Sequence, residues 1–453
     1  MEGNLGRMQR FVVRMWGEVK SPLYRNAIFL MLTSIIASGL GFLFWFVVYR
    51  VYPSASDRDL AVTLLNTITF LATIATLGFP IGLIRFLPET EDKTDLINTT
   101  LTIGGAAAAI LTLIFVAGVG LWAPALGFVL ERPEYLIILI LTAMAYAFGP
   151  LLDQVAVAMR RSDLFTWRVV VFSLLKIPLP IVFVTFFFAS LGGKMGIYLS
   201  FGLAFGVSVI LTGYVFIPRI VKGYRPKPRL SRRRLRPMFA FSVGNWLAGV
   251  VASAATLLLP LLILNTLGNP SLEPDPAEGL VSVYYVATLL AGILYIIPQA
   301  TMTSFFAEAS QRNAQRRRDE RKAVLLSLGL LAPGIVGLWI LAAPLLDLFD
   351  LGRYQDIGAT PVRILSLAAI PLFLNSVLGT RVRVRKRVQP LIVSAAIATA
   401  VTLGLGYSLL RWMQLDGLAI AVALGQVATL PYLYAVAGAP MEVEPIEPTP
   451  SPP

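Results

Sequence analysis

The side chains of this sequence that could do chemistry are few, because its 453 residues include no His and no Cys. Their absence excludes a histidine base, a cysteine nucleophile, a disulfide and a zinc site built from these residues. A P-loop pattern is also absent, so the sequence offers no backbone cradle for a nucleotide. We therefore expect a protein that is not an enzyme and that needs no cofactor or metal.

The deepest charge within an apolar segment is Lys176, in the run SLLKIPLP. A charged side chain inside a membrane costs on the order of several kcal/mol unless it faces a cavity or a partner. One interpretation is a cavity residue that binds an anionic headgroup. The other is a structural role, either an ion pair with Asp153 or snorkelling to the interface. Asp153 is itself a candidate for carrying a coupling ion, with pairing to Arg160 or Lys176 as the alternative.

Two arginines and several uncharged polar residues complete the candidate substrate site. Arg85 ends an apolar segment, where interface anchoring is the favoured alternative to substrate binding, and Arg363 is placed to line an exterior vestibule. Amides and aromatic rings suit sugars, whose faces are apolar and whose rims form hydrogen bonds. The same residues equally suit hydrogen bonds between membrane helices. The remaining candidates of this kind are Asn66, Asn245, Tyr284, Tyr285 and Gln299.

The elements that must position these side chains are membrane-spanning helices. Hydrophobic residues make up 57% of the chain and charged residues 14%, whereas soluble domains have about 45–50% and 25%. A span needs about 20 mostly apolar residues. The segments that meet this requirement are 27–49, 60–84, 96–121, 136–157, 164–188, 195–217, 239–264, 280–306, 323–346, 361–380, 390–410 and 415–436.

The distribution of Lys and Arg orients these twelve spans. With the adjoining helix ends, the N-terminus and the loops after even-numbered spans carry 30 of these residues, whereas the loops after odd-numbered spans carry 7. Cytoplasmic loops are enriched in Lys and Arg, so both termini are predicted to be cytoplasmic in a multi-pass protein of the plasma (inner) membrane. The net charge of +13 thus reflects topology, and no nucleic-acid partner is expected.

The longest polar connection predicts a division into two six-helix lobes. Segment 219–238 follows six spans and carries nine positive charges and three prolines. An even number of spans gives both lobes the same orientation, as in transporters whose halves are related by an axis along the membrane normal. We predict an N-terminal lobe over 27–218 and a C-terminal lobe over 239–436. Residues 1–26 are expected to form a cytoplasmic amphipathic segment and 437–453 a disordered acidic, Pro-rich tail.

Four stretches, in their order along the chain, carry a family resemblance. They are the Gly- and Ser-rich first span (26–50), LGFPIGLIRFLPETEDKTDLIN (77–98), LLDQVAVAMRRSDLFTWRVVVFSLL (151–175) and 284–318, which contains YYVATLLAGIL and IIPQATMTSFFAEAS. This arrangement resembles the polysaccharide and oligosaccharide flippases of the multidrug/oligosaccharidyl-lipid/polysaccharide exporter (MOP) superfamily. The resemblance implies an all-α, MATE-like fold of about twelve transmembrane helices in two lobes.

The resemblance also implies a function. Such proteins move a polyprenyl-pyrophosphate-linked oligosaccharide between membrane leaflets by alternating access, for cell-surface polysaccharide or glycoconjugate biosynthesis. The implied partners are membrane lipids and the lipid-linked oligosaccharide, with glycosyltransferases or a polymerase of the same pathway as candidates. Many relatives carry an acidic residue in span seven, where this chain has Ala254, Ala255 and Thr256. That departure weighs against a carboxylate-based coupling step there.

Two alternatives to a flippase remain at this stage. A cation-coupled multidrug exporter of the same fold would use acidic and aromatic cavity residues, and Asp153 is the one well-placed acid. A membrane glycan polymerase is less favoured, because such enzymes commonly place paired acidic residues on a sizeable outer loop and the outer loops here are short.

Overall fold

The structure, a computed structural model, describes residues 22–231, 235–269, 275–309, 316–384 and 389–438. Within these ranges the chain is helical and contains no strand, which confirms the predicted all-α class. The α-helices are α2 (Pro22–Val51), α3 (Ala55–Ala75), α4 (Phe79–Phe86), α5 (Lys93–Ala117), α6 (Val119–Trp122), α7 (Pro133–Ala158), α8 (Ser162–Lys176), α9 (Leu179–Phe186), α10 (Phe188–Leu211), α11 (Leu235–Leu257), α12 (Leu259–Leu267), α13 (Leu280–Ala309), α14 (Arg316–Leu348), α15 (Gln355–Leu367), α16 (Ala369–Val384) and α17 (Gln389–Gly438). Short 3-10 or π turns occur at Pro124–Leu130, Thr212–Phe216, Ile217–Arg219 and Gly352–Tyr354.

The predicted polytopic membrane architecture is confirmed. Over the described residues, ten helical segments are long and apolar enough to cross a membrane. One of them, α17, runs for 50 residues and is interrupted by a non-helical residue, Gln414, between the predicted spans 390–410 and 415–436. The first predicted span, 27–49, lies within α2, where Ile36–Val51 is a shorter apolar stretch. All twelve predicted segments therefore fall on helix.

Several spans consist of two helices joined by a short break, and proline explains where the breaks fall. Pro80, Pro180 and Pro260 each lie in the first turn of the second helix, in α4, α9 and α12. Proline has no backbone N–H and its ring clashes with the carbonyl four residues earlier, so a helix cannot run through it undistorted. The break at Ile177 and Pro178 ends α8 at Lys176, which leaves that lysine at a helix end within an apolar span.

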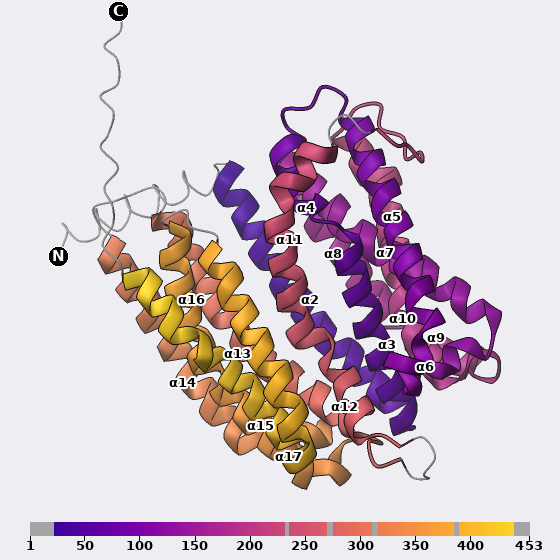
Figure 1. The fold of residues 1–453 in the computed structure, drawn as a ribbon, viewed down its shortest axis with the longest axis vertical. Helices are drawn as coiled ribbons and strands as arrows, with labels where there is room; N and C mark the ends of the chain where they lie inside the picture. Colours follow the sequence, from indigo (N-terminus) through magenta and orange to yellow (C-terminus); the bar gives the residue numbers. More distant parts are fainter. Residues whose placement is uncertain (1–21, 232–234, 270–274, 310–315, 385–388, 439–453) are drawn as a thin grey trace, which may run out of the picture.

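The helices pack in two groups along the chain. Helices α2–α10 pack mainly against one another, and so do α11–α17. Figure 1 shows the second group, coloured red to yellow, beside the indigo and magenta helices of the first, with α11 also packed against α3 and α4. This last contact is close, since a Cβ at Gly82 would clash with the Met238 side chain. The predicted lobe boundaries agree with this grouping but stay a prediction.

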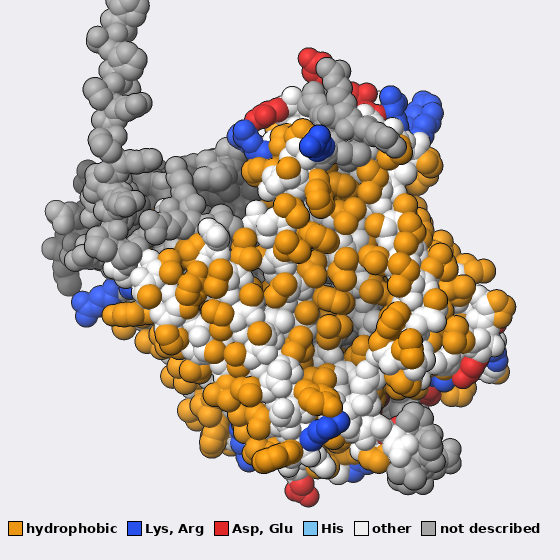
Figure 2. Space-filling view, in the orientation of Figure 1, with side chains coloured by type: hydrophobic (Ala, Val, Ile, Leu, Met, Phe, Trp, Pro, Cys, Tyr) orange, Lys and Arg blue, Asp and Glu red, His pale blue; other side chains and the backbone are white. Residues whose placement is uncertain are grey.

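The surface agrees with a membrane location. Figure 2 shows hydrophobic side chains over the middle of the visible face, with Lys, Arg, Asp and Glu gathered toward its ends and one side. Many large apolar side chains are exposed, among them Leu121, Ile340 and Trp412. Such a surface suits lipid rather than water. The predicted N-terminal segment 1–26 and the tail 437–453 lie almost entirely outside the described residues.

The described part of the basic connection after α10 lies along α5 rather than in free solution. Asn98 Nδ2 donates to the Arg225 carbonyl over 2.9 Å, and the Arg229 amide donates to Thr102 Oγ1 over 3.0 Å. The Arg229 guanidinium forms an ion pair with Asp95. These contacts fix the path of the chain from the first group of helices toward the second.

Candidate substrate site

A cavity of about 400 Å³ lies between the two groups of helices. One wall comes from α2, α3, α8 and α10, and the other from α11 and α13. Among the lining residues that the structure describes, Lys176 is the only charged one. The other lining residues are mostly apolar or aromatic, with Trp45 and Phe201 on one wall and Tyr285 on the other. A movement of the two groups relative to each other would change the shape of this central cavity.

Lys176 is buried, with 3% of its surface exposed, and its ammonium group is surrounded by aromatic rings. The Nζ atom lies 4.6 Å from the ring centre of Phe172, 5.3 Å from that of Phe201 and 5.7 Å from that of Phe44. In the described part of the chain, no carboxylate oxygen lies within the 4.0 Å of an ion pair. Desolvated cation–π contacts contribute about 2 kcal/mol, less than the cost of burying a charge. An anion entering the cavity would supply the missing counter-charge.

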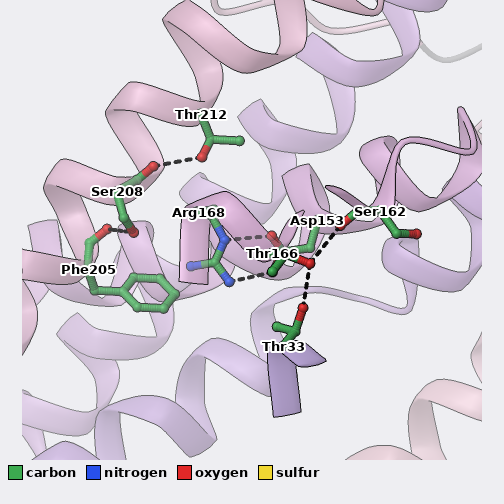
Figure 3. Close-up of polar contacts among 8 residues, drawn as sticks. All are labelled: Thr33, Asp153, Ser162, Thr166, Arg168, Phe205, Ser208 and Thr212. Atoms are coloured by element: carbon green, nitrogen blue, oxygen red, sulfur yellow. Dashed lines mark hydrogen bonds and ion pairs between the residues drawn. The ribbon is translucent and has the colours of Figure 1, made fainter. Parts of the chain in front are cut away.

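Asp153 pairs with Arg168 rather than with Lys176 or Arg160. The two carboxylate oxygens accept hydrogen bonds from Arg168 Nε and Nη2, at 2.5 and 2.6 Å, and both side chains are buried. Figure 3 shows this face-to-face pair between α7 and α8, with Phe205 to one side. The Arg168 guanidinium lies 5.1 Å from the centre of the Phe205 ring. Because both oxygens are engaged by a permanent cation, the pair has the geometry of a structural ion pair between α7 and α8. Ion coupling at Asp153 stays a prediction.

A second cavity, of about 520 Å³, lies within the other group of helices. Its walls come from α11, α13, α16 and both halves of α17, and Gln299 is one of its lining residues. Thr256 lines both cavities, so the two are adjacent.

The other predicted site residues are distributed as follows. Asn66 and Tyr285 line the central cavity with Lys176, and Asn66 Nδ2 also donates to the Val62 carbonyl over 2.8 Å. Tyr284 is buried outside both cavities, and Asn245 is half-buried, also outside them.

The two predicted arginines also lie outside both cavities. Arg85 is exposed and pairs with Glu89 at 3.1 Å, as interface anchoring would require, and Arg363 Nε donates to the Trp339 carbonyl over 3.2 Å. Substrate binding by these four residues outside the cavities stays a prediction.

The sequence reasoning missed a contact between the two groups of helices at Asp59. Its buried carboxylate accepts hydrogen bonds from the amides of Gly279 (2.6 Å) and Ser282 (2.8 Å) and from the Ser282 hydroxyl. These amides belong to the first turn of α13 and the residue before it, where backbone N–H groups have no partner within the helix. Asp59, near the start of α3, therefore caps a helix of the other group.

Aromatic and cationic contacts surround this cap. Tyr49 donates to the Ser282 carbonyl over 3.0 Å. Arg58 is fully buried, lies 4.9 Å from the Tyr49 ring centre and donates to the Tyr49 carbonyl over 3.2 Å. The Phe349 ring packs against Tyr49 with centres 5.7 Å apart. Three charged residues in succession near the start of a span (SDRDL, 56–60) were the available signal. We call Asp59, Gly279 and Ser282 with Tyr49 the latch.

The two groups of spanning helices are joined by the latch at one end and have a cavity between them. This arrangement is that of a membrane transporter fold. The solved structures that resemble it include the lipid II flippase MurJ in an inward closed conformation (TM-score 0.69, 16% identity, 91% of this chain and 87% of that one). Two structures of a MATE-family multidrug transporter of the MOP superfamily also match. The outward-facing one has TM-score 0.64 and 14% identity, covering 92% of this chain and 95% of that one. The inward-facing one has TM-score 0.63 and 14% identity, covering 88% and 94%.

The family follows from the sequence itself. A family model described as "Polysaccharide biosynthesis protein" matches residues 60–357, so the chain belongs to that family. The comparison with curated proteins gives no match. The predicted family and the predicted MATE-like fold are thereby confirmed.

Proposed function

We propose that this protein is a flippase that moves a polyprenyl-pyrophosphate-linked oligosaccharide across the plasma membrane by alternating access. The observation that carries the proposal is Lys176, a buried cation without a carboxylate partner among the described residues, in a cavity walled by both groups of helices. A pyrophosphate is the anion that such a substrate would bring. Membership of a polysaccharide biosynthesis family and the likeness to a lipid II flippase support it.

The geometry suggests how transport would proceed. The latch joins the two groups at the end where α2 terminates and α12 lies, the lower end in Figure 1. The basic connection after α10 lies at the opposite end, which the charge distribution assigns to the cytoplasm. In this state the latched end is therefore the outer one. Release of the latch, with closure at the cytoplasmic end, would present the same lysine to the outer leaflet.

A cation-coupled drug exporter fits the site less well. An acidic cavity residue would attract cationic drugs, yet Lys176 is the only charge among the described lining residues of the central cavity. Asp153, the acid proposed for that role, is engaged by Arg168. Efflux of cationic drugs that depends on Asp153 would favour the exporter.

Transport in proteoliposomes tests the proposal. Purified protein is reconstituted with lipid-linked oligosaccharide extracted from a host deletion strain, and the fraction accessible to an external glycan-cleaving enzyme is followed with time. We expect accessibility to rise faster than in protein-free vesicles. In the deletion strain, the same glycolipid should accumulate facing the cytoplasm. Unchanged surface glycan in that strain, with no transport in vesicles, would overturn the proposal.

A further inference from the structure

The cavity inside the second group of helices is lined by uncharged polar groups, by apolar side chains and by one described charged residue, Arg383. Asn375 on α16 donates through Nδ2 to the Gln426 carbonyl (2.8 Å) and to Gln426 Oε1 (3.0 Å). Thr429 donates in turn to Asn375 Oδ1 over 2.8 Å. These three residues lie on α16 and the second half of α17, and all three line the cavity. A carboxamide network of this kind holds its members in fixed orientations.

The network leaves hydrogen-bonding capacity facing the cavity. A carboxamide nitrogen has two donors, and no acceptor for Gln426 Nε2 occurs among the described residues. The hydroxyls of Ser376 and Thr380 donate to backbone carbonyls one turn earlier, at 2.9 and 2.7 Å, which leaves their oxygens free to accept. The wall therefore offers both donors and acceptors at short spacing.

This chemistry selects among possible occupants. The described lining residues include no carboxylate, and Arg383 is their only charge, so a cationic drug or metal ion would meet no counter-charge. A lipid tail would leave the amides and hydroxyls without water, at about 1–3 kcal/mol for each group left unpaired. Sugar hydroxyls both donate and accept, and so match the wall.

We infer that this cavity is the glycan subsite of the transporter, binding uncharged sugar residues while Lys176 binds the pyrophosphate. Thr256 lines both cavities, so a pyrophosphate-linked sugar chain could occupy both at once. The two ends of one headgroup would then contact different groups of helices, and the substrate itself would bridge them. This inference rests on the proposed function, because it assigns a second part of the same substrate.

Two substrates that share a pyrophosphate but differ in sugar test the inference. The probes are the lipid-linked oligosaccharide from the deletion strain and a polyprenyl pyrophosphate without sugar, each reconstituted with wild type, Asn375→Leu, Gln426→Leu and Lys176→Ala. The matched control is Gln154→Leu, because Gln154 is a half-buried carboxamide residue on α7 that lies outside both cavities. Thermal unfolding checks that each variant is folded.

The expected result is selective. Asn375→Leu and Gln426→Leu should slow transport of the oligosaccharide substrate about tenfold. The reason is that leucine cannot form the hydrogen bonds by which the site distinguishes a sugar from a group without hydroxyls. They should leave the sugar-free substrate within about twofold of wild type, whereas Lys176→Ala should slow both. Equal effects on both substrates, or none on either, would overturn the glycan subsite and leave the flippase proposal standing.

A binding measurement tests the glycan subsite independently of transport. The oligosaccharide released from its lipid by mild acid is titrated into purified wild type and Asn375→Leu in detergent. Binding that weakens about tenfold in the variant supports the subsite, and equal or absent binding to both overturns it, whatever the vesicles show. Failure of wild type to move either lipid would count against the flippase proposal alone.

Discussion

At the scale of single residues, the environment of Lys176 determines its role. Its ammonium group is buried among three aromatic rings, with no carboxylate partner among the described residues. It can therefore pair with an anion that enters the cavity. The sequence revealed the depth of this lysine but left a pair with Asp153 open. Sequence could not resolve that choice, because Arg168 and Asp153 come together only when α7 and α8 pack.

Replacement of Lys176 by Ala should lower transport of the lipid-linked oligosaccharide about tenfold or more. The reason is the loss of a charge-assisted contact to the pyrophosphate, worth about 1.5–3 kcal/mol. Initial rates in proteoliposomes measure this. Lys176→Arg should retain part of the activity, because it keeps the charge. Lys194→Ala is the matched control, since Lys194 also lies over a Phe ring, at 4.2 Å from the Phe128 centre, but outside the central cavity. Wild-type rates for Lys176→Ala would refute a cationic binding site.

Asp153→Asn should destabilise the protein, because it leaves the Arg168 cation buried without a counter-ion. Removal of one partner of a buried ion pair costs about 3–5 kcal/mol. Thermal unfolding followed by tryptophan fluorescence should show a lower midpoint. The double variant Asp153→Leu with Arg168→Leu should recover much of the loss. A role in ion coupling instead requires that Asp153→Asn keeps the wild-type midpoint but loses the pH dependence of transport.

At the scale of helices, the sequence predicted the elements well but not which of them touch. Hydropathy gave twelve apolar segments because each must span the same thickness of lipid. The breaks follow from prolines such as Pro80 and Pro260, which the sequence also shows. The cap of α13 by Asp59 could not be predicted, because it joins residues more than 200 positions apart whose contact depends on the packing of both groups of helices.

Asp59→Ala should loosen the latch, because it leaves the amides of Gly279 and Ser282 and the Ser282 hydroxyl without their acceptor. The chain has no native Cys, so a single Cys at Ser38 on the cavity wall reports access to the central cavity. Labelling of Ser38→Cys by a membrane-impermeant maleimide from outside should rise several-fold in the Asp59→Ala background.

Asp57→Ala is the control for that experiment. Asp57 lies two residues before Asp59, in the first turn of α3, but its carboxylate sits beside Gly193 rather than α13. Labelling should therefore stay at the level of Ser38→Cys alone. Equal labelling of Asp59→Ala and Asp57→Ala would show that the latch does not hold the outer end closed.

At the scale of the whole molecule, the latch and the central cavity lie on the same boundary between the two groups of helices. If substrate leaves through the latched end, that end must open in every cycle. Paired cysteines at Asp59 and Ser282, whose side chains are in contact, should therefore arrest transport when oxidised to a disulfide. Because no other Cys is present, cross-linking is confined to this pair.

Transport by the Asp59→Cys, Ser282→Cys protein should fall to the protein-free background on oxidation and return on reduction. Each single variant, treated with the same oxidant, measures the effect of the substitution without the cross-link. A covalent tie at this boundary prevents the outer opening while leaving Lys176 and the cavity walls unchanged, so binding of the released oligosaccharide should persist in the oxidised protein. Full transport with complete cross-linking would mean that substrate leaves by a route that does not separate α3 from α13.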